Sequence, residues 1–286
     1  MRPDFQNIVE LFGLVPPDEV ELGDFSDDPS EEAVALVDTL DAADEALGAG
    51  EYDKAVKLYS RALESSEDPL RAYHGMAAAL DCKDDAPQAL RQYLKILRIN
   101  TDDVQAHLGL ADVYSRSGHP SEGLRELEEA IKRDPSDPTL YMKLAQALRK
   151  LGYREKALGA VQHSVLMKPD ESFYHYWMAD LLLELKRYPE SLGAFRAAVE
   201  LSPGDDFLYA ESALAFWANG HPAEAIKACQ LASDLNPTNK AYQGLLVKLL
   251  QKNNQQEEAR RIGAKLMLDR YDADWVDRAL ARLPKA

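Results

Sequence analysis

The chain has 286 residues, with 33 Lys and Arg against 49 Asp and Glu, a formal net charge of −16 and 46% hydrophobic residues. It contains no uninterrupted apolar run of about 18 residues, so we expect no membrane span, and its N-terminus does not resemble a secretory signal. Two cysteines, Cys82 and Cys229, are too few for a disulfide framework. The acidic balance argues against nucleic acid as a partner. These features predict a soluble protein, with a reducing cytoplasm as the expected compartment.

The N-terminal segment differs in composition from the rest of the chain. Residues 1–35 contain ten acidic residues and a single base, Arg2, so an eighth of the chain carries over half of its net charge. Apolar residues precede most of these acids at near-helical spacing, among them Phe5, Ile8, Val9 and Phe12. We predict an acidic arm at residues 1–28 that occupies a groove, its own or a neighbour's, and so permits self-association. Two alternatives remain: the apolar motif covers the first repeat, or it docks into a separate protein.

From residue 36 onward the sequence repeats with a period of 34 residues. Seven windows follow one another without a gap, starting at residues 36, 70, 104, 138, 172, 206 and 240. Fixed positions within the windows carry fixed residue types: alanine at the eighth position in six windows, small residues at the twentieth (Ala55, Ala89, Gly123, Ala157, Ser191, Ala225, Ala259), glycine at the fifteenth (Gly50, Gly118, Gly152, Gly220) and proline at the thirty-second (Pro135, Pro169, Pro203, Pro237).

Each of these positions has a physical reason. Apolar residues at positions 4, 7, 8 and 11 predict an amphipathic helix over the first fourteen residues of each window. Glycine at position 15 suits the left-handed conformation that ends a helix, and proline at position 32 ends the second helix. Small residues at positions 8 and 20 let the two helices approach closely. One such hairpin cannot bury both of its faces, so we expect the hairpins to stack on one another.

The pattern resembles the tetratricopeptide repeat (TPR) family. The family's aromatic residue at position 24 is present as Tyr59, Tyr93 and Phe195, but Leu127, Val161, Cys229 and Gly263 replace it in the other windows. The resemblance implies an all-α fold, a right-handed α-solenoid of antiparallel helix pairs. We place this seven-repeat solenoid at residues 29–273 and expect a C-terminal capping helix within residues 274–286 that shields the last hairpin.

The sequence lacks the residue motifs that would predict an enzyme. None of the six histidines pairs with another ligand at metal-binding spacing on one helix face, and Cys229 occupies a core position. The sequence contains no phosphate-binding loop, dinucleotide fingerprint or serine elbow. We therefore predict no catalytic, cofactor or metal site.

The resemblance implies that positions 2, 5, 9 and 12 of each first helix line a concave groove, with positions 6 and 13 at its flanks. In windows 5 and 6 these positions carry aromatic residues outside the core stripe, and in window 4 they carry basic residues. Exposed aromatic residues are typical anchors for a protein partner, and basic residues can bind carboxylates. The alternatives are that Phe173 and Phe207 wedge between repeats and that the basic face is simply solvated. The predicted protein-binding residues are Lys143, Gln146, Arg149, Lys150, Phe173, Tyr176, Trp177, Asp180, Phe207 and Trp217.

Two groove chemistries of TPR proteins are disfavoured, because neither the clamp for acidic chaperone tails nor an asparagine ladder is present. We predict a non-catalytic module that binds a protein or peptide with apolar or aromatic anchors and an acidic flank in the groove of repeats 4–6. Such a module would act as an adaptor, assembly factor or targeting chaperone. The alternative is a regulatory or sensory subunit of an enzyme complex, with the arm as an autoinhibitory or self-association element; a small-ligand sensor is a weaker third possibility.

Overall fold

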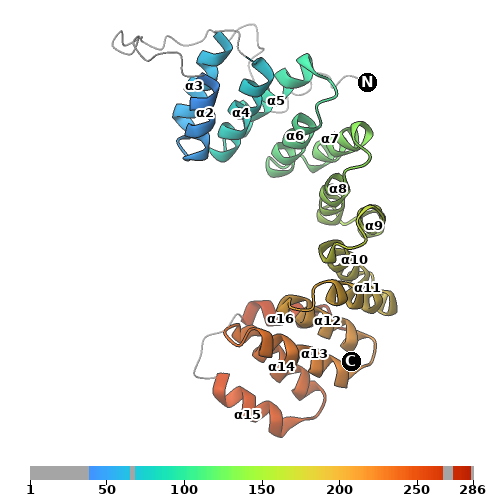
Figure 1. Cartoon of the computed structure of the whole chain (residues 1–286). Coiled ribbons are helices and arrows are strands. Elements are labelled where there is room, and N and C mark those ends of the chain that lie inside the picture. Colours follow the sequence, from blue (N-terminus) through green and yellow to red (C-terminus); the bar gives the residue numbers. More distant parts are fainter. Residues whose placement is uncertain (1–38, 65–67, 267–272, 285–286) are drawn as a thin grey trace. The chain divides into compact units, whose positions relative to one another are not determined.

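The computed structural model describes residues 39–64, 68–266 and 273–284, which form fifteen helices, α2 to α16, and no strand (Figure 1). The predicted arm at residues 1–28 lies outside the described residues. Among the described residues, no helix has both the length and the apolar character needed to cross a membrane. The predicted all-α architecture of helix pairs is confirmed.

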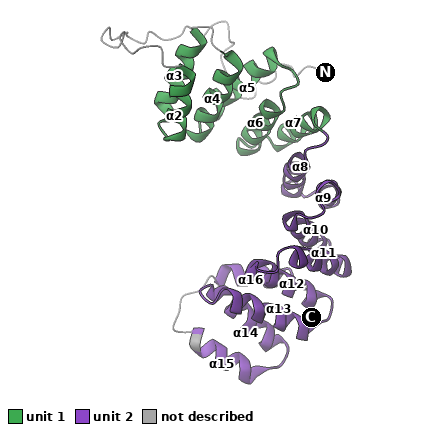
Figure 2. Ribbon diagram, in the orientation of Figure 1, with its two compact units in different colours: residues 1–134 green, residues 135–286 purple. Residues whose placement is uncertain are grey.

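The chain forms two compact units, Met1–Asp134 and Pro135–Ala286, and the boundary between them lies in the connection between α7 and α8, close to the start of the fourth repeat (Figure 2). The described helices of unit 1 are α2 (Thr39–Gly48), α3 (Tyr52–Glu64), α4 (Pro69–Cys82), α5 (Ala86–Ile99), α6 (Val104–Arg116) and α7 (Pro120–Arg133). Those of unit 2 are α8 (Pro138–Lys150), α9 (Arg154–Met167), α10 (Ser172–Glu184), α11 (Tyr188–Leu201), α12 (Asp206–Ala218), α13 (Pro222–Leu235), α14 (Lys240–Lys252), α15 (Gln256–Leu266) and α16 (Ala273–Ala281).

The ends of the helices follow the local sequence. At the start of the first helix of most repeats, an acidic or amide side chain accepts hydrogen bonds from the first backbone N–H groups. Asp103 and Asp205 are two of these N-caps. The turn inside each repeat needs a left-handed residue at position 15, and all four glycines there have positive φ. The other three repeats adopt the same conformation without glycine, at Asp84, Lys186 and Asn254.

Small residues let the two helices of each repeat pack closely. The alanines at positions 8 and 20 of repeat 2, Ala77 and Ala89, are fully buried. Where position 20 is not alanine, the contact is just as tight: a Cβ on Gly123 would lie 2.8 Å from the Ala111 carbonyl oxygen. Ser191 instead donates a hydrogen bond to the Ala179 carbonyl oxygen at 2.8 Å.

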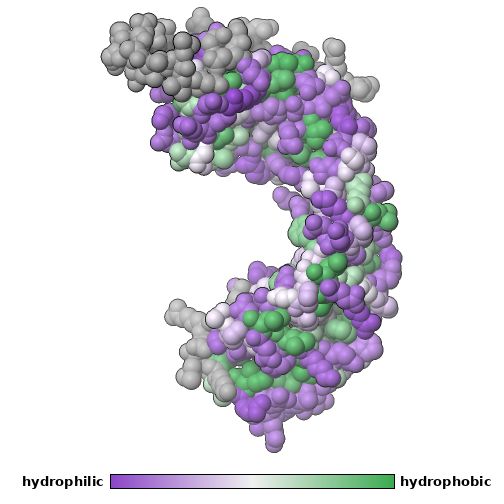
Figure 3. Space-filling view, viewed as in Figure 1, coloured by the Kyte–Doolittle hydropathy of each residue, from purple (hydrophilic) through white to green (hydrophobic). Residues whose placement is uncertain are grey.

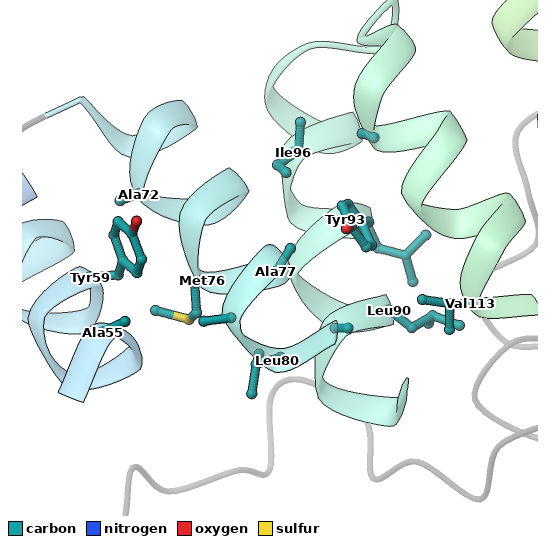
Figure 4. Close-up of a cluster of buried hydrophobic side chains, with 14 of the residues drawn as sticks. Ala55, Tyr59, Ala72, Met76, Ala77, Leu80, Leu90, Tyr93, Ile96 and Val113 are labelled. Carbon is teal, nitrogen blue, oxygen red and sulfur yellow. The ribbon is translucent and has the colours of Figure 1, made fainter. Parts of the chain in front are cut away.

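Tyrosines fill the space between successive repeats of unit 1 (Figure 4). Tyr59 is fully buried, and a Cβ built on Gly75 of the next repeat would lie 2.1 Å from its Cζ atom. Tyr93 and Gly109 repeat this arrangement at the same distance. The aromatic residue at position 24 therefore packs where the following repeat has no side chain at position 6.

The terminal helix α16 lies against the first helices of two repeats. It contacts α14, which belongs to the last hairpin, and also α12 of the preceding repeat (Figure 1). Val276, Ala279 and Leu283 are buried there in a cluster with Leu214 and Leu246. Helix α16 thus packs over the side of α12 and α14 on which the sequence places the predicted groove.

Candidate functional site

Four aromatic residues of unit 2 meet on the first helices of repeats 5 and 6. Phe173, Tyr176 and Trp177 lie on α10 and Phe207 on α12, and we call these four residues the aromatic cluster. The Tyr176 and Phe207 ring centroids are 5.3 Å apart, those of Phe173 and Trp177 are 6.3 Å apart, and both pairs pack edge to face. Phe173 is 50% exposed, whereas the other three are partly buried. The cluster is therefore a set of mutually packed rings of which one, Phe173, is open to solvent.

Arg149 on α8 connects the aromatic cluster to a network of ion pairs. Its guanidinium lies 5.1 Å from the Trp177 ring centroid, a cation–π contact. Its Nη2 lies 2.7 Å from Asp180 Oδ2, and its Nε lies 3.0 Å from Glu184 Oε1. Arg154 Nε binds the other oxygen of Glu184 at 2.9 Å. The predicted residue Arg149 and the neighbouring Arg154 are thus already paired with carboxylates of α10.

Asp180 and Glu211 form a pair of buried carboxylates on α10 and α12. Each residue is only 3% exposed. Arg282, which follows α16, binds both of them: Nη1 lies 2.6 Å from Glu211 Oε2, and Nη2 contacts Asp180 Oδ1. We call Asp180 and Glu211 the carboxylate pair. A single guanidinium bridges the first helices of two consecutive repeats.

Burial and neighbouring charges shift the pKa values of the ionisable side chains in this network. Burial raises the pKa of Glu211, and the nearby Arg282 does not fully offset this effect. Burial also raises the pKa of Glu184, but hydrogen bonds and charges from Arg149 and Arg154 outweigh it, so the net shift is downward. Burial and the charge of Asp180 hold the pKa of the Tyr176 phenol well above its ordinary value.

The other predicted site residues take different positions. On α8, Gln146 and Lys150 are exposed and Lys143 is partly buried. Trp217 is partly buried against the core cluster that includes residues of α14 and α16. The structure thus brings Arg149 and Asp180 together with the aromatic cluster and packs Trp217 against the core cluster.

Tetratricopeptide repeat models match residues 40–104, 144–206 and 104–147, more than half of the chain. The chain belongs to the TPR family. Comparison with curated protein sequences finds no significant match.

Solved TPR structures resemble this chain at low sequence identity. The C-terminal part of a TPR protein from Cytophaga hutchinsonii is 14% identical, with a TM-score of 0.68, and the alignment covers 86% of this chain and all of the other. MamA from Desulfovibrio magneticus is 24% identical, with a TM-score of 0.53, covering 62% of this chain and 96% of MamA. YrrB, a TPR protein described as having an unusual peptide-binding site, is 21% identical, with a TM-score of 0.53, covering 63% of this chain and 92% of YrrB. These likenesses support the TPR fold.

The sequence analysis did not find the role of Arg282. In the TPR window that would start at residue 274, Arg282 falls at position 9, a groove position, but it binds carboxylates 102 and 71 residues earlier in the chain. The available signal was the pair of acids at groove positions of repeats 5 and 6, since buried carboxylates need a cation. Sequence alone shows neither that these acids are buried nor which cation reaches them.

No metal site accompanies this network in the described part of the chain. No group of three or more His, Cys, Asp or Glu residues there could hold a metal ion. Cys229 is buried and its thiol donates to the Tyr242 carbonyl oxygen at 3.3 Å, as expected for a small core residue. The chemistry that the site offers is therefore ion pairing and aromatic contact.

Proposed function

We propose that this TPR protein is a non-catalytic binding module that takes up a protein or peptide segment on the predicted groove face of repeats 4–6. The observation that carries the proposal is the aromatic cluster, which keeps Phe173 half exposed although it touches Trp177. A TPR fold in general supports protein–protein interaction. The peptide-binding site described for YrrB shows that a protein of similar fold can bind a peptide.

The charges beside the aromatic cluster indicate how the segment would lie. Arg149 is already bound to Asp180 and Glu184, so we expect the exposed Lys150 to meet an acidic flank of the partner. An apolar or aromatic anchor would pack on Phe173. The surface of unit 2 visible in Figure 3 is mostly hydrophilic with separate hydrophobic patches, which suits a partner recognised at a few apolar points. The role would be that of an adaptor, assembly factor or targeting chaperone.

A peptide selection tests this proposal. Random peptides displayed on phage are selected on the intact protein, and the affinity of the best synthetic peptide is measured by fluorescence anisotropy. We expect Phe173→Ala to weaken binding about tenfold or more, because an aromatic anchor contributes on the order of 1–2 kcal/mol.

Tyr153→Ala is the matched control, because Tyr153 is 53% exposed and lies just before α9, away from the aromatic cluster contacts. It should leave the affinity unchanged, and Lys150→Glu should weaken binding of peptides with an acidic flank. Equal effects of Phe173→Ala and Tyr153→Ala, or a selection that yields no binder, would contradict the proposal.

A further inference from the structure

The carboxylate pair is built to hold a cation. Asp180 and Glu211 lie on first helices of consecutive repeats and are each 3% exposed, yet their oxygens reach two nitrogens of a single guanidinium. Removing two carboxylates from water is unfavourable unless a positive group compensates them. The pair would therefore be strongly unfavourable if it were both ionised and empty.

The cation comes from a small and distant part of the chain. Arg282 follows α16, a helix of nine residues in which Val276 and Ala279 are the buried side chains. Helices of this length are marginal by themselves, so α16 depends on its contacts with α12 and α14. The group that fills the pair is thus attached through a limited set of contacts.

The internal arginine uses only part of its hydrogen-bonding capacity. Its Nη1 and Nη2 bind the pair, whereas its Nε is buried and has no hydrogen-bond partner. A guanidinium has five N–H donors, and a buried donor without a partner is unfavourable. An arginine entering from another direction could bind the same carboxylates and keep its Nε hydrogen-bonded to water or to its own chain.

The neighbouring residues fit the same ligand. Arg149 occupies Oδ2 of Asp180, so a cation that replaced Arg282 would bind Oδ1 of Asp180 and the carboxylate of Glu211. Tyr176, whose phenol is influenced by the charges of Asp180, Glu211 and Arg282, belongs to the aromatic cluster. The carboxylate pair and the cluster are therefore neighbours, and a ligand that carries a cation next to an apolar side chain could contact both.

We propose that Asp180 and Glu211 form a guanidinium-binding site for an arginine side chain of a partner protein, and that this arginine replaces Arg282 of the chain itself. Arginine suits the site better than lysine, because its planar fork presents two nitrogens that can bridge two carboxylates on separate helices. This inference rests on the proposed function and names one recognition element of the partner.

Small probes test the site directly in the full-length protein. Calorimetry compares the binding of N-acetyl-arginine amide with that of N-acetyl-citrulline amide, its neutral isostere, to the Arg282→Ala variant at low ionic strength. We expect the arginine probe to bind at least tenfold more tightly than the citrulline probe. Adding Asp180→Asn and Glu211→Gln to the variant should abolish this difference. Equal affinity for the two probes, or no binding of the arginine probe, would overturn the proposal.

Hydrogen exchange on the unmodified protein gives a second test that does not depend on the fold of a variant. The arginine probe should accelerate amide exchange in residues 273–284 in proportion to its concentration, because it competes with Arg282, whereas the citrulline probe should not. The helices of unit 1 serve as the internal reference and should not respond. If α16 exchanges at the same rate with both probes, Arg282 is not displaced and the proposal is wrong.

The outcomes separate this inference from the proposed function. If Arg282→Ala binds the arginine probe while Phe173→Ala leaves peptide affinity unchanged, the guanidinium site stands and the aromatic anchor does not. If selected peptides need Phe173 but the two probes bind alike, the binding module stands and the guanidinium site does not.

Discussion

Units 1 and 2 use the same repeat for different purposes, and position 6 of the first helix shows the difference. In repeats 2 and 3 of unit 1 it is Gly75 or Gly109, and the tyrosine of the preceding repeat covers it. In repeats 5 and 6 of unit 2 the equivalent residues are Trp177 and Glu211, which take part in the aromatic cluster and the carboxylate pair. A position that serves packing in repeats 2 and 3 therefore carries side chains of the proposed binding site in repeats 5 and 6.

One arginine ion pair in each unit shows how far burial can differ between the two. In unit 1, Arg116 binds Asp81 at 2.6 Å, but the arginine side chain is 45% exposed. In unit 2, Arg282 binds Asp180 and Glu211, whose side chains are 5% and 3% exposed. Exposed pairs contribute less than about 1 kcal/mol, whereas breaking a buried pair costs about 3–5 kcal/mol. We therefore expect the ion pair of Arg116 to contribute little to stability and that of Arg282 to contribute much more.

The largest expected effect comes from Arg282→Ala, which leaves the buried Glu211 without its cation and the buried Asp180 with Arg149 alone. We expect the free energy of unfolding to fall by about 3 kcal/mol, against less than about 1 kcal/mol for the control Arg116→Ala. Urea unfolding followed by tryptophan fluorescence reports on unit 2, since all three tryptophans, Trp177, Trp217 and Trp275, lie there. Circular dichroism follows both units.

Adding Asp180→Asn and Glu211→Gln to Arg282→Ala removes the charges and should restore part of the loss. If these substitutions restore nothing, uncompensated charge is not the cause. A loss for Arg116→Ala as large as that for Arg282→Ala would remove the contrast between the two units.

A smaller effect is expected for Gly75→Ala in unit 1. The added Cβ would lie 2.1 Å from Cζ of the fully buried Tyr59, so the ring or the helix must move. Overpacking costs about 1–3 kcal/mol, and the better helix propensity of alanine returns up to about 1 kcal/mol, which leaves a net loss of about 1–2 kcal/mol. Thermal and urea unfolding measured by circular dichroism give the value.

Gly193→Ala is the matched control in unit 2, because it lies inside α11 and nothing is within 4 Å of its added Cβ. It should gain about 0.5–1 kcal/mol from helix propensity alone. Similar changes for Gly75→Ala and Gly193→Ala would show that the tyrosine contact does not constrain position 6.

The smallest effect concerns the turn inside the repeat. Lys186 in unit 2 and Asp84 in unit 1 have φ values of 61° and 60° at position 15. Left-handed backbone is unfavourable for most residues but less so for aspartate, and glycine accepts it freely. We expect Lys186→Gly to stabilise the protein by about 0.5 kcal/mol and Asp84→Gly to stabilise it less, as measured by urea unfolding. If Lys186→Gly destabilises the protein, the Lys186 side chain makes a contact that stabilises the fold by more than its left-handed backbone destabilises it.

Much of the candidate site is predictable from sequence because its members lie on one helix face at fixed repeat positions. Phe173, Tyr176 and Trp177 are within five residues of one another, and Phe207 is at position 2 of the next repeat, as Phe173 is of its own. Trp217 is also an aromatic residue at a groove position, but it packs against the core cluster that contains residues of α16. The repeat pattern does not include α16, so it cannot anticipate that contact.

The sequence by itself determined the helix pairs, their period and the close approach of their helices, because alanine, glycine and proline act on backbone geometry within a few residues. Tertiary structure alone decided which charges are buried. A single guanidinium joins the carboxylates of Asp180 and Glu211 only because α16 packs against α12 and α14 and brings Arg282 to them from 71 to 102 residues away. Burial, and with it the strength of an ion pair, depends on which element covers the site, and no local pattern encodes that.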